Sequence, residues 1–275
     1  MAFRVAGKFV ALAFAAVSMF PLAAAAAPSC GNGPAGFSAW LQDFKTEAAE
    51  RGISSRVLDS AFAGVTYDKK VIGYDRHQHA FKMTLKEFMA RRAPPYYVKR
   101  AKEKMASNAY LLARIQKRFG VQPEIIVAIW GMETGFGSYM GNMSTIRSLA
   151  TLAYDCRRHA FFTNELYSAL EIIQRGDMTA AEMRGAWAGE IGQTQLLASK
   201  YLQYAVDFDG DGRRDLIHSR ADVLASTANF LKGHGWIRGA GYQPGQPNFA
   251  VLSAWNRATV YQQALALFAE KIIAK

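Results

Sequence analysis

The chain has 275 residues, of which 51% are hydrophobic, 20% are charged and 12% are aromatic, and its formal net charge is +11. This length and composition allow a sizeable core and exclude wholesale disorder, collagen-like repeats and a coiled coil. The basic excess favours an acidic partner (nucleic acid, anionic lipid or an acidic polymer), and charge alone does not choose among them.

The first 27 residues have the three-part layout of a secretory signal peptide. A basic start precedes an apolar run from Phe9 to Phe20, and an alanine tract ends at Ala27, where we expect cleavage. Pro21 and the alanines leave the strongly apolar part shorter than the ~20 residues that a bilayer requires, which argues against a membrane anchor.

Cleavage would remove Arg4 and Lys8 and no acidic residue, so the formal net charge would fall by two, from +11 to +9. An exported protein seldom meets nucleic acid, and its basic charge therefore favours the cell wall or a membrane surface. The residues before Cys30 are a poor context for lipidation. We predict a soluble, exported, periplasmic protein rather than a lipoprotein.

The chain has two cysteines, Cys30 and Cys156. In an oxidising compartment an even count first indicates one disulfide, and the alternative is two unpaired buried thiols. Closing so long a loop would stabilise the fold by about 4–5 kcal/mol in the chain-entropy model. The bond would tie the N-terminal segment to the middle of the chain.

Helical periodicity dominates the rest of the chain. Apolar residues recur at three- and four-residue spacing from Phe37 to Ala48 and predict a helix that ends before Gly52. Short helices joined by polar turns are expected up to Arg92. After a proline pair, one longer helix is expected from Tyr96 to a glycine cap at position 120.

A carboxylate ends the apolar stripe of the next predicted helix. That helix begins at Pro123, and its inward residues are Ile126, Ile129, Trp130 and then Glu133. Strand signals are few and short, so the sequence predicts a mainly α fold. Further helices are predicted over 161–175, 221–232 and 261–273, the last after a Gly/Pro-rich loop over 239–247.

Glu133 is the first candidate for chemistry. It lies beside Trp130, Met132 and Phe136, where poor solvation would disfavour the anion and raise the pKa of the carboxyl toward the range of a general acid. The alternative is an exposed residue in the last turn of a helix.

Two polar segments follow Glu133 in the chain. Arg157 and Arg158 come after an apolar helix, and they either face solvent or hold a carboxylate. Segment 187–195 combines small residues with glutamines, including Gln195, whose neutral amides suit the hydroxyl and acetamido groups of sugars. The alternative is a plain polar loop.

Residues 207–212 match the first half of a calcium-binding loop, with oxygen ligands at positions 1, 3 and 5 and glycine at position 6. Position 12 is His218 rather than glutamate, so an ordinary EF-hand is excluded and Asp215 or Asp222 would close the site. The alternative is an Asp/Gly turn without metal. The other expected ligands are Asp207, Asp209, Asp211 and, through its carbonyl oxygen, Arg213.

The sequence contains no nucleophile elbow of serine hydrolases, no phosphate-binding loop of nucleotide-binding proteins and no zinc-protease helix. Taken together, the polar segments resemble the lytic murein transglycosylases of the B type over nearly all of the mature chain. The residues that carry the resemblance are ETGFG (133–137), LATL (149–152), RR (157–158), AGEIGQTQ (188–195), YAVDFDGDG (204–212) and GW (235–236).

The resemblance implies a lysozyme-like core with additional helical N- and C-terminal parts and little β structure. It divides the mature chain into a helical N-terminal part (28–119), a catalytic core (120–239) and a C-terminal part that completes the cleft (240–275). It also implies that Asp222 closes the calcium loop and that Glu133 is the single catalytic glutamate. The substrate contacts that we expect are Gln195, Arg157, Arg158, Phe136, Phe230, Asn256 and Tyr261.

The reaction implied by the resemblance cleaves the β-1,4 bond between N-acetylmuramic acid and N-acetylglucosamine in peptidoglycan. Glu133 gives a proton to the glycosidic oxygen and then accepts the proton of the muramoyl C6 hydroxyl, which closes a 1,6-anhydro ring. Neither added water nor a catalytic cofactor is needed, and the calcium ion would be structural. We expect a monomer whose partner is peptidoglycan and not nucleic acid, and protein partners are not readable from the sequence.

Three departures from the family pattern keep other functions open. Ala186 stands where similar proteins carry a serine beside the catalytic glutamate, Phe230 replaces an aromatic hydroxyl, and residues 196–198 lack the usual Phe and Pro. The alternatives are a non-catalytic peptidoglycan-binding protein and a conventional muramidase that adds water.

Overall fold

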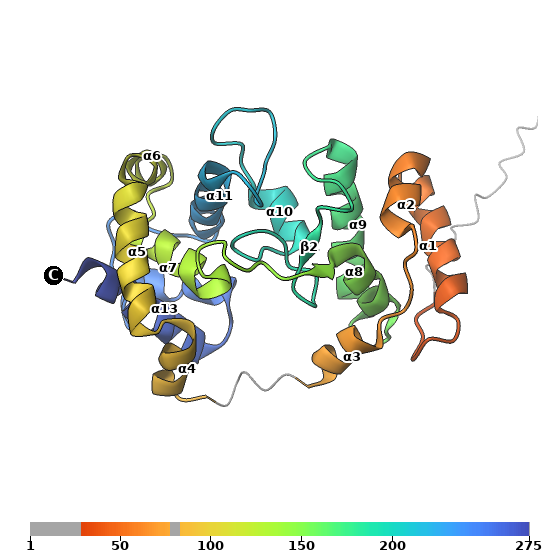
Figure 1. The fold of residues 1–275 in the computed structure, drawn as a ribbon, viewed down its shortest axis with the longest axis horizontal. Helices are drawn as coiled ribbons and strands as arrows, with labels where there is room; N and C mark the ends of the chain where they lie inside the picture. The colour runs from red at the N-terminus through yellow and green to blue at the C-terminus, as the bar shows by residue number, and fades with distance from the viewer. Residues whose placement is uncertain (1–28, 78–82, 275) are drawn as a thin grey trace, which may run out of the picture.

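The computed structural model describes residues 29–77 and 83–274, and the predicted signal peptide lies outside the described residues. Helices make up most of this part of the chain, and two short strands form its one regular sheet (Figure 1). The mainly α fold expected from the sequence is confirmed. No helix among the described residues has both the length and the apolar character needed to cross a membrane.

Two separate stretches of the chain form the lobe at the right of Figure 1, which we call the N-terminal lobe. Its helices are α1 (Phe37–Glu50), α2 (Ser55–Phe62), α3 (Lys69–Arg76), α8 (Thr145–Tyr154) and α9 (His159–Arg175). The apolar stripe predicted from Phe37 to Ala48 is the buried face of α1. Helices α1, α2 and α3 pack against α8, and α8 packs along α9.

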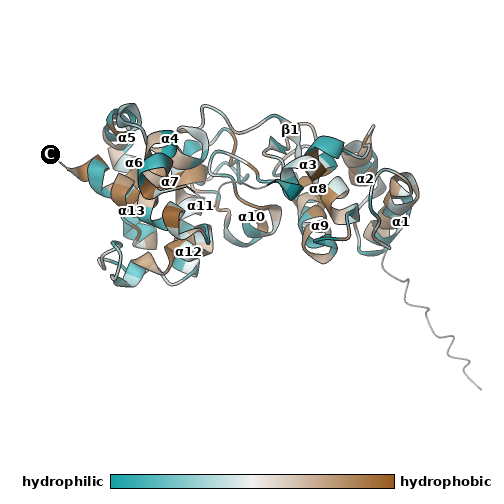
Figure 2. Ribbon diagram, turned by 90° about the horizontal axis from the view of Figure 1, so that it is seen from below, coloured by the Kyte–Doolittle hydropathy of each residue, from teal (hydrophilic) through white to brown (hydrophobic). Residues whose placement is uncertain are grey.

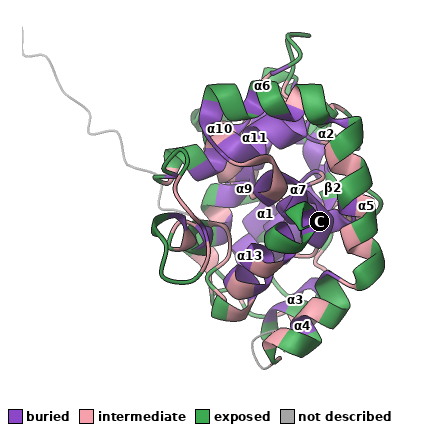
Figure 3. Ribbon diagram, turned by 90° about the vertical axis from the view of Figure 1, so that its left-hand side faces the viewer, coloured by how far each residue is buried: buried purple, intermediate pink, exposed green. Residues whose placement is uncertain are grey.

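The second lobe, which we call the C-terminal lobe, surrounds helix α7. Its helices are α4 (Leu85–Arg92), α5 (Pro95–Ser107), α6 (Ala109–Phe119), α7 (Pro123–Thr134), α11 (Arg220–Gly233), α12 (Leu252–Trp255) and α13 (Thr259–Ile273), with a short turn of 3-10 helix, η2 (Pro247–Phe249). Helix α7 is buried over most of its length and packs against α5, α6, α11 and α13. Figure 3 shows this contrast between a buried α7 and an α5 with an exposed outer face.

The single helix expected from Tyr96 to Gly120 is wrong, because the structure divides it at Asn108 into α5 and α6. The side-chain Nδ2 of Asn108 donates to the carbonyl oxygen of Lys104 at 2.8 Å, and the side-chain Oδ1 accepts a hydrogen bond from Arg220 at 3.0 Å. An asparagine side chain that binds the backbone competes with helical hydrogen bonding. The break therefore turns α6 toward α11.

Two elements, a two-stranded sheet and a helix, lie between the lobes. Strand β1 (Met143–Ser144) pairs antiparallel with β2 (Arg184–Gly185), with Met143 opposite Gly185. Helix α10 (Ala198–Tyr204) lies between the lobes and contacts α9 and α11. The lobes cut across the three parts expected from the sequence, since residues 28–119 contribute to both. Figure 2 shows helices with hydrophilic and hydrophobic faces in both lobes.

A disulfide anchors the first described residues to the end of α8. Cys30 and Cys156 are bonded, with their Cα atoms 4.9 Å apart. The N–H of Gly31 donates to the carbonyl oxygen of Tyr154 at 2.9 Å. A Cβ atom at Gly31 would lie 2.1 Å from the Tyr154 hydroxyl oxygen, so only glycine fits there.

Candidate active site

A cavity of about 810 Å³ lies between the two lobes, and Glu133 is one of the residues that line it. Its walls come from α3, the ends of α7, α11 and α12, and the segments that cross between the lobes. Of the residues predicted from the sequence, Gln195, Phe230 and Asn256 also line this cavity. The fold therefore brings together residues that are widely separated in the chain.

Glu133 occupies the last turn of α7. Gly135, with φ 58°, ends the helix in the left-handed conformation, and its N–H donates to the carbonyl oxygen of Gly131 at 2.9 Å. Two side chains donate to Oε1 of Glu133: the indole N–H of Trp255 at 3.0 Å and the hydroxyl of Tyr261 at 2.5 Å. These donors orient the carboxyl group in the cavity.

The surroundings of Glu133 suit a general acid. Burial raises the pKa of the Glu133 carboxyl, and the hydrogen bonds from Tyr261 and Trp255 and the charge of Arg92 oppose this rise without cancelling it. A raised pKa keeps a carboxyl protonated closer to neutral pH, which a group that gives a proton to a leaving oxygen requires.

Gln195 lines the cavity in a conformation unusual for its residue type, with φ 55°. Its Nε2 donates to the carbonyl oxygens of Met140 at 3.0 Å and Gly192 at 2.9 Å. The amide group is thereby held in one orientation, and its Oε1 accepts no hydrogen bond from the described residues. The side chain can accept a hydrogen bond from a ligand.

A neighbouring glutamine, Gln193, braces this loop against α7. Its Oε1 accepts from the indole N–H of Trp130 at 2.8 Å, and its carbonyl oxygen accepts from the Thr134 hydroxyl at 2.5 Å. The two segments that carry Glu133 and Gln195 are therefore fixed relative to each other.

Phe230 and Asn256 form part of the wall on the side of the C-terminal lobe. Phe230 is 3% exposed, and its ring packs edge-on against Trp255 at a centroid distance of 4.9 Å. Oδ1 of Asn256 accepts the N–H of Ala258 at 2.9 Å, which fixes the amide in the cavity wall. Phe230 thus supports Trp255, one of the two donors to Glu133.

Phe136 and Tyr261 are buried next to the site rather than in its wall. Phe136, with φ 63°, packs edge-on against Trp130 at a centroid distance of 5.6 Å, beneath the end of α7. Tyr261, on α13, reaches Glu133 through its hydroxyl. Neither Phe136 nor Tyr261 is among the described residues that line the cavity.

Arg157 and Arg158 bind a carboxylate of the protein itself. Nε of Arg157 donates to Oδ2 of Asp75 at 2.6 Å, and Arg158 forms a second ion pair with the same carboxylate. Burial opposes ionisation of Asp75, but the hydrogen bonds from both arginines hold the pKa of its carboxyl below the usual value. The pair joins α3 to the start of α9, and this contact positions the α3 wall of the cavity.

Sequence reasoning missed three residues around Glu133: Trp255, Arg92 and Glu190. Trp255 directly precedes the predicted site residue Asn256, and this adjacency is the signal that could have identified it. Arg92 and Glu190 line the cavity as well. Glu190 lies within the segment 188–195, where the prediction rested on the glutamine amides and did not include the carboxyl group of Glu190.

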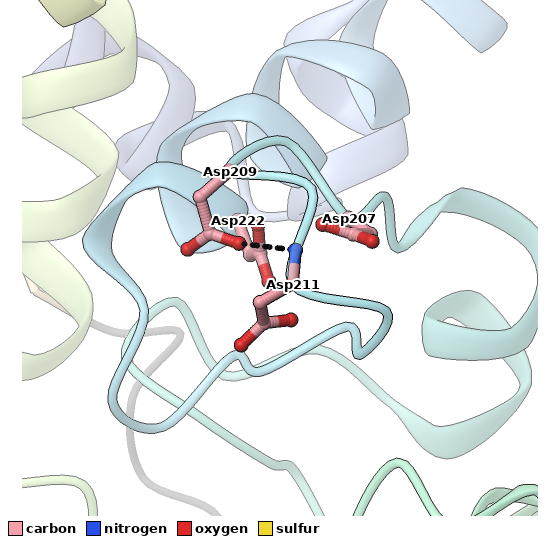
Figure 4. A group of neighbouring side chains, drawn as sticks. All are labelled: Asp207, Asp209, Asp211 and Asp222. Atoms are coloured by element: carbon pink, nitrogen blue, oxygen red, sulfur yellow. Dashed lines mark hydrogen bonds between the residues drawn. The ribbon is translucent and has the colours of Figure 1, made fainter.

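Four aspartates form a second cluster, away from the cavity: Asp207, Asp209, Asp211 and Asp222. One carboxylate oxygen from each lies within 4.8 Å of the others, and Figure 4 shows the four side chains side by side. The carboxylate of Asp207 accepts the N–H groups of Gly210 at 2.6 Å and Gly212 at 2.8 Å. Glycine at position 212, with φ 92°, is therefore part of the turn that gathers the acids.

The structure places Asp222, and not Asp215, in this acidic cluster. Asp222 is fully buried in the first turn of α11 and accepts the N–H groups of Phe208 at 2.7 Å and Asp215 at 2.9 Å. Burial and the neighbouring charge of Asp209 raise the pKa of the Asp222 carboxyl. Asp215 instead pairs with His218 at 3.0 Å. Four converging carboxylates that form no ion pair with a basic side chain in the described part of the chain suit a hard divalent cation.

Comparison with known families gives one match along most of the chain. Residues 36–245 match the family described as the transglycosylase SLT domain. The membrane-bound lytic murein transglycosylase B of Escherichia coli (strain K12) is 39% identical over 145 residues. The aligned region covers 50% of this chain and 40% of that relative.

Solved structures share the fold over most of the chain. SltB3 from Pseudomonas aeruginosa, in complex with NAG-NAM-pentapeptide, has a TM-score of 0.83 and 34% identity, covering 87% of this chain and 80% of SltB3. The Escherichia coli lytic transglycosylase Slt35 in complex with calcium has a TM-score of 0.76 and 24% identity, covering 84% of this chain and 92% of Slt35. The second likeness concerns the fold alone.

Proposed function

Since the chain belongs to the family of transglycosylase SLT domains, we propose that it is a lytic transglycosylase that cleaves peptidoglycan and leaves 1,6-anhydro-N-acetylmuramic acid ends. The observation that carries this proposal is the half-buried Glu133 at the wall of the cavity, with the pKa of its carboxyl raised and two donors on Oε1. The 34% identity with SltB3, which was solved with a peptidoglycan fragment, supports the same substrate class.

The proposed reaction uses one carboxyl group twice. Protonated Glu133 gives its proton to the glycosidic oxygen as the bond to C1 of the muramoyl residue breaks. The resulting carboxylate, stabilised by Tyr261 and Trp255, then takes the proton of the C6 hydroxyl while that oxygen bonds to C1. Glu133 regains its proton at the end, so the cycle needs no cofactor.

The other predicted residues divide by their place in the structure. Gln195, Phe230 and Asn256 line the cavity, and we propose that they contact the sugar. Tyr261 acts through Glu133, and Phe136 supports the end of α7. We assign Arg157 and Arg158 a positioning role, because both form ion pairs with Asp75.

Product analysis tests this function against its rivals. Digestion of purified peptidoglycan followed by mass spectrometry is expected to release anhydro-muropeptides. Reducing ends would indicate a muramidase that adds water, and no release would indicate a binding protein, a reading that Ala186 permits. Glu133→Gln is expected to abolish release while binding to the wall persists.

We further propose that the acidic cluster holds one structural calcium ion. Asp207, Asp209, Asp211 and Asp222 would supply carboxylate oxygens, and the carbonyl oxygen of Arg213 a neutral one. Mutual repulsion of four close carboxylates destabilises the loop, and a divalent cation relieves it. The ion would hold the loop before α11 and has no part in the proton transfer.

The partner of the protein in this proposal is peptidoglycan, whose lactyl and peptide carboxylates complement the basic mature chain. The proposed location is the periplasm, reached through the signal peptide and without a lipid anchor, and the active form is a monomer. Fractionation of cells that produce the full chain, followed by sizing of the released protein, tests these points together.

A further inference from the structure

The cavity holds a second carboxyl group, Glu190, for which the proposed proton transfer has no use. Glu190 and Glu133 both line the cavity. Ordinary glycosidases place two carboxyl groups beside the scissile bond, whereas the reaction above uses one. The proposed reaction therefore does not explain why Glu190 lies in the cavity wall.

The backbone holds Glu190 firmly in the cavity wall. Its neighbour Ile191 is bonded in both directions to Leu196, with N–H to O distances of 2.8 and 3.0 Å, and also bridges to Gly185. A Cβ atom at Gly185 would lie 1.7 Å from the carbonyl oxygen of Glu190, so the two segments approach as closely as backbones can. The direction of the Glu190 side chain is thus set by the loop.

One oxygen of the Glu190 carboxyl is bound by the protein and the other is not. Oε2 accepts the N–H of Ala188 at 3.1 Å. Within the described ranges, Oε1 accepts no hydrogen bond and no basic side chain forms an ion pair with Glu190. Arg158 acts on it by charge, but the guanidinium of Arg158 is paired with Asp75.

Burial and nearby charged groups of the cavity set the pKa of the Glu190 carboxyl. Burial raises the pKa of its carboxyl, the backbone N–H groups of Glu190 itself and of Ala188 oppose the rise, and the negative charge of Glu133 adds to it. Lys70, Arg92 and Lys200 line the same cavity. A half-buried carboxyl without a cation is costly unless a ligand supplies a donor.

We propose that Glu190 is a substrate-contacting residue whose Oε1 accepts a hydrogen bond from an N–H or O–H group of the N-acetylated sugar bound beside Glu133. This inference rests on the proposed function, because it takes the sugar of that reaction as the donor. An ionised carboxylate can only accept hydrogen bonds, and sugars and acetamido groups offer donors that match it. Such charge-assisted bonds are roughly twice as strong as neutral ones.

Binding measurements without turnover provide the first test. In a Glu133→Gln background, titration calorimetry with GlcNAc-MurNAc-pentapeptide is expected to show a Kd that rises about 10- to 100-fold on Glu190→Ala, or about 1.4–2.8 kcal/mol. Glu190→Gln should give a smaller rise, because its amide oxygen still accepts but carries no charge. The matched control is Glu103→Ala, an exposed acid on α5, which should leave Kd unchanged.

Two results would overturn the inference. One is an equal Kd with and without Glu190→Ala. The other is a weaker Kd that accompanies a lower melting temperature in Glu190→Ala while Glu190→Gln binds like its parent, since that pattern assigns the residue to holding the loop.

Kinetics on peptidoglycan separate this inference from the proposed function. With Glu133 intact, Glu190→Ala is expected to lower kcat/KM about 10- to 100-fold while the products keep their anhydro ends. A wild-type protein that releases no anhydro products contradicts the function itself. A wild type that releases them, beside a Glu190→Ala variant of equal kcat/KM, contradicts only the role of Glu190.

Discussion

Tyr261→Phe is the sharpest test of how the site controls its acid. The substitution removes the hydroxyl that donates to Oε1 of Glu133 at 2.5 Å and keeps the ring, which packs edge-on against Phe88 at a centroid distance of 6.1 Å. The indole N–H of Trp255 remains as the second donor, at 3.0 Å. The fold should therefore persist while one support of the carboxylate is lost.

The expected loss of rate follows from the charge on Glu133 after it has given up its proton. A hydrogen bond to a charged group contributes about 1.5–3 kcal/mol, and each 1.4 kcal/mol is about tenfold in rate. Because the carboxylate forms as the glycosidic bond breaks, most of this stabilisation belongs to the transition state. We expect kcat/KM for peptidoglycan to fall about 10- to 100-fold.

The pH dependence gives the sign of the effect. The hydrogen bond from Tyr261 lowers the pKa of Glu133 by favouring its anion, so the variant should have a higher pKa. The carboxyl then stays protonated to higher pH, and the alkaline limb of the kcat/KM profile should move upward in pH. Rates of anhydro-muropeptide release, measured across the pH range, provide both quantities.

Tyr242→Phe is the matched control. Its hydroxyl also donates to a carboxylate, Oε1 of Glu124 at 3.3 Å, and its ring is also buried. Neither residue lines the cavity within the described chain, and the control should keep wild-type rates and pH limbs. A Tyr261→Phe variant with an unchanged rate and limb, or with a limb moved to lower pH, would refute the role given to this hydroxyl.

Four other variants test separate parts of the molecule. Burial raises the pKa of Glu133 in the folded state, so the folded protein loses stability as the pH rises through that pKa and the carboxyl ionises. Glu133→Gln cannot ionise, and it should therefore melt at a higher temperature than the wild type above that pKa and at the same temperature in acid. Equal melting temperatures at every pH, measured by calorimetry, would contradict this expectation. Replacing Cys30 and Cys156 by serine should lower the free energy of unfolding by up to about 5 kcal/mol, as expected for a sequence separation of 126, with little change in kcat at temperatures where the fold survives. Calcium should raise the melting temperature of the wild type and not that of Asp207→Ala, and melting insensitive to calcium and to chelator would leave the loop as a metal-free turn. Gln195→Ala should reduce turnover by about tenfold and leave the anhydro product unchanged, and loss comparable to Glu133→Gln would show that the amide does more than contact the sugar.

Local patterns in the sequence determine the helices and the types of chemistry available. The stripe from Phe37 to Ala48 becomes the buried face of α1, because apolar spacing of three and four residues forms one face of any α-helix. Pro123 and Gly135 delimit α7 by their own backbone preferences, which leaves Glu133 in its last turn. The spacing of the acids in the 207–212 loop likewise gathers their carboxylates through a short turn.

Tertiary structure alone decides which distant groups meet. Trp255 and Tyr261 donate to Glu133 across sequence separations of 122 and 128 residues, and no local pattern encodes such a contact. The carboxylate that binds Arg157 and Arg158 is Asp75, 82 and 83 residues away, and this contact braces α3 against the start of α9. An arginine or a carboxylate can bind many different groups. The packing of the helices decides which group it binds, because each buried charge requires a partner within hydrogen-bonding distance.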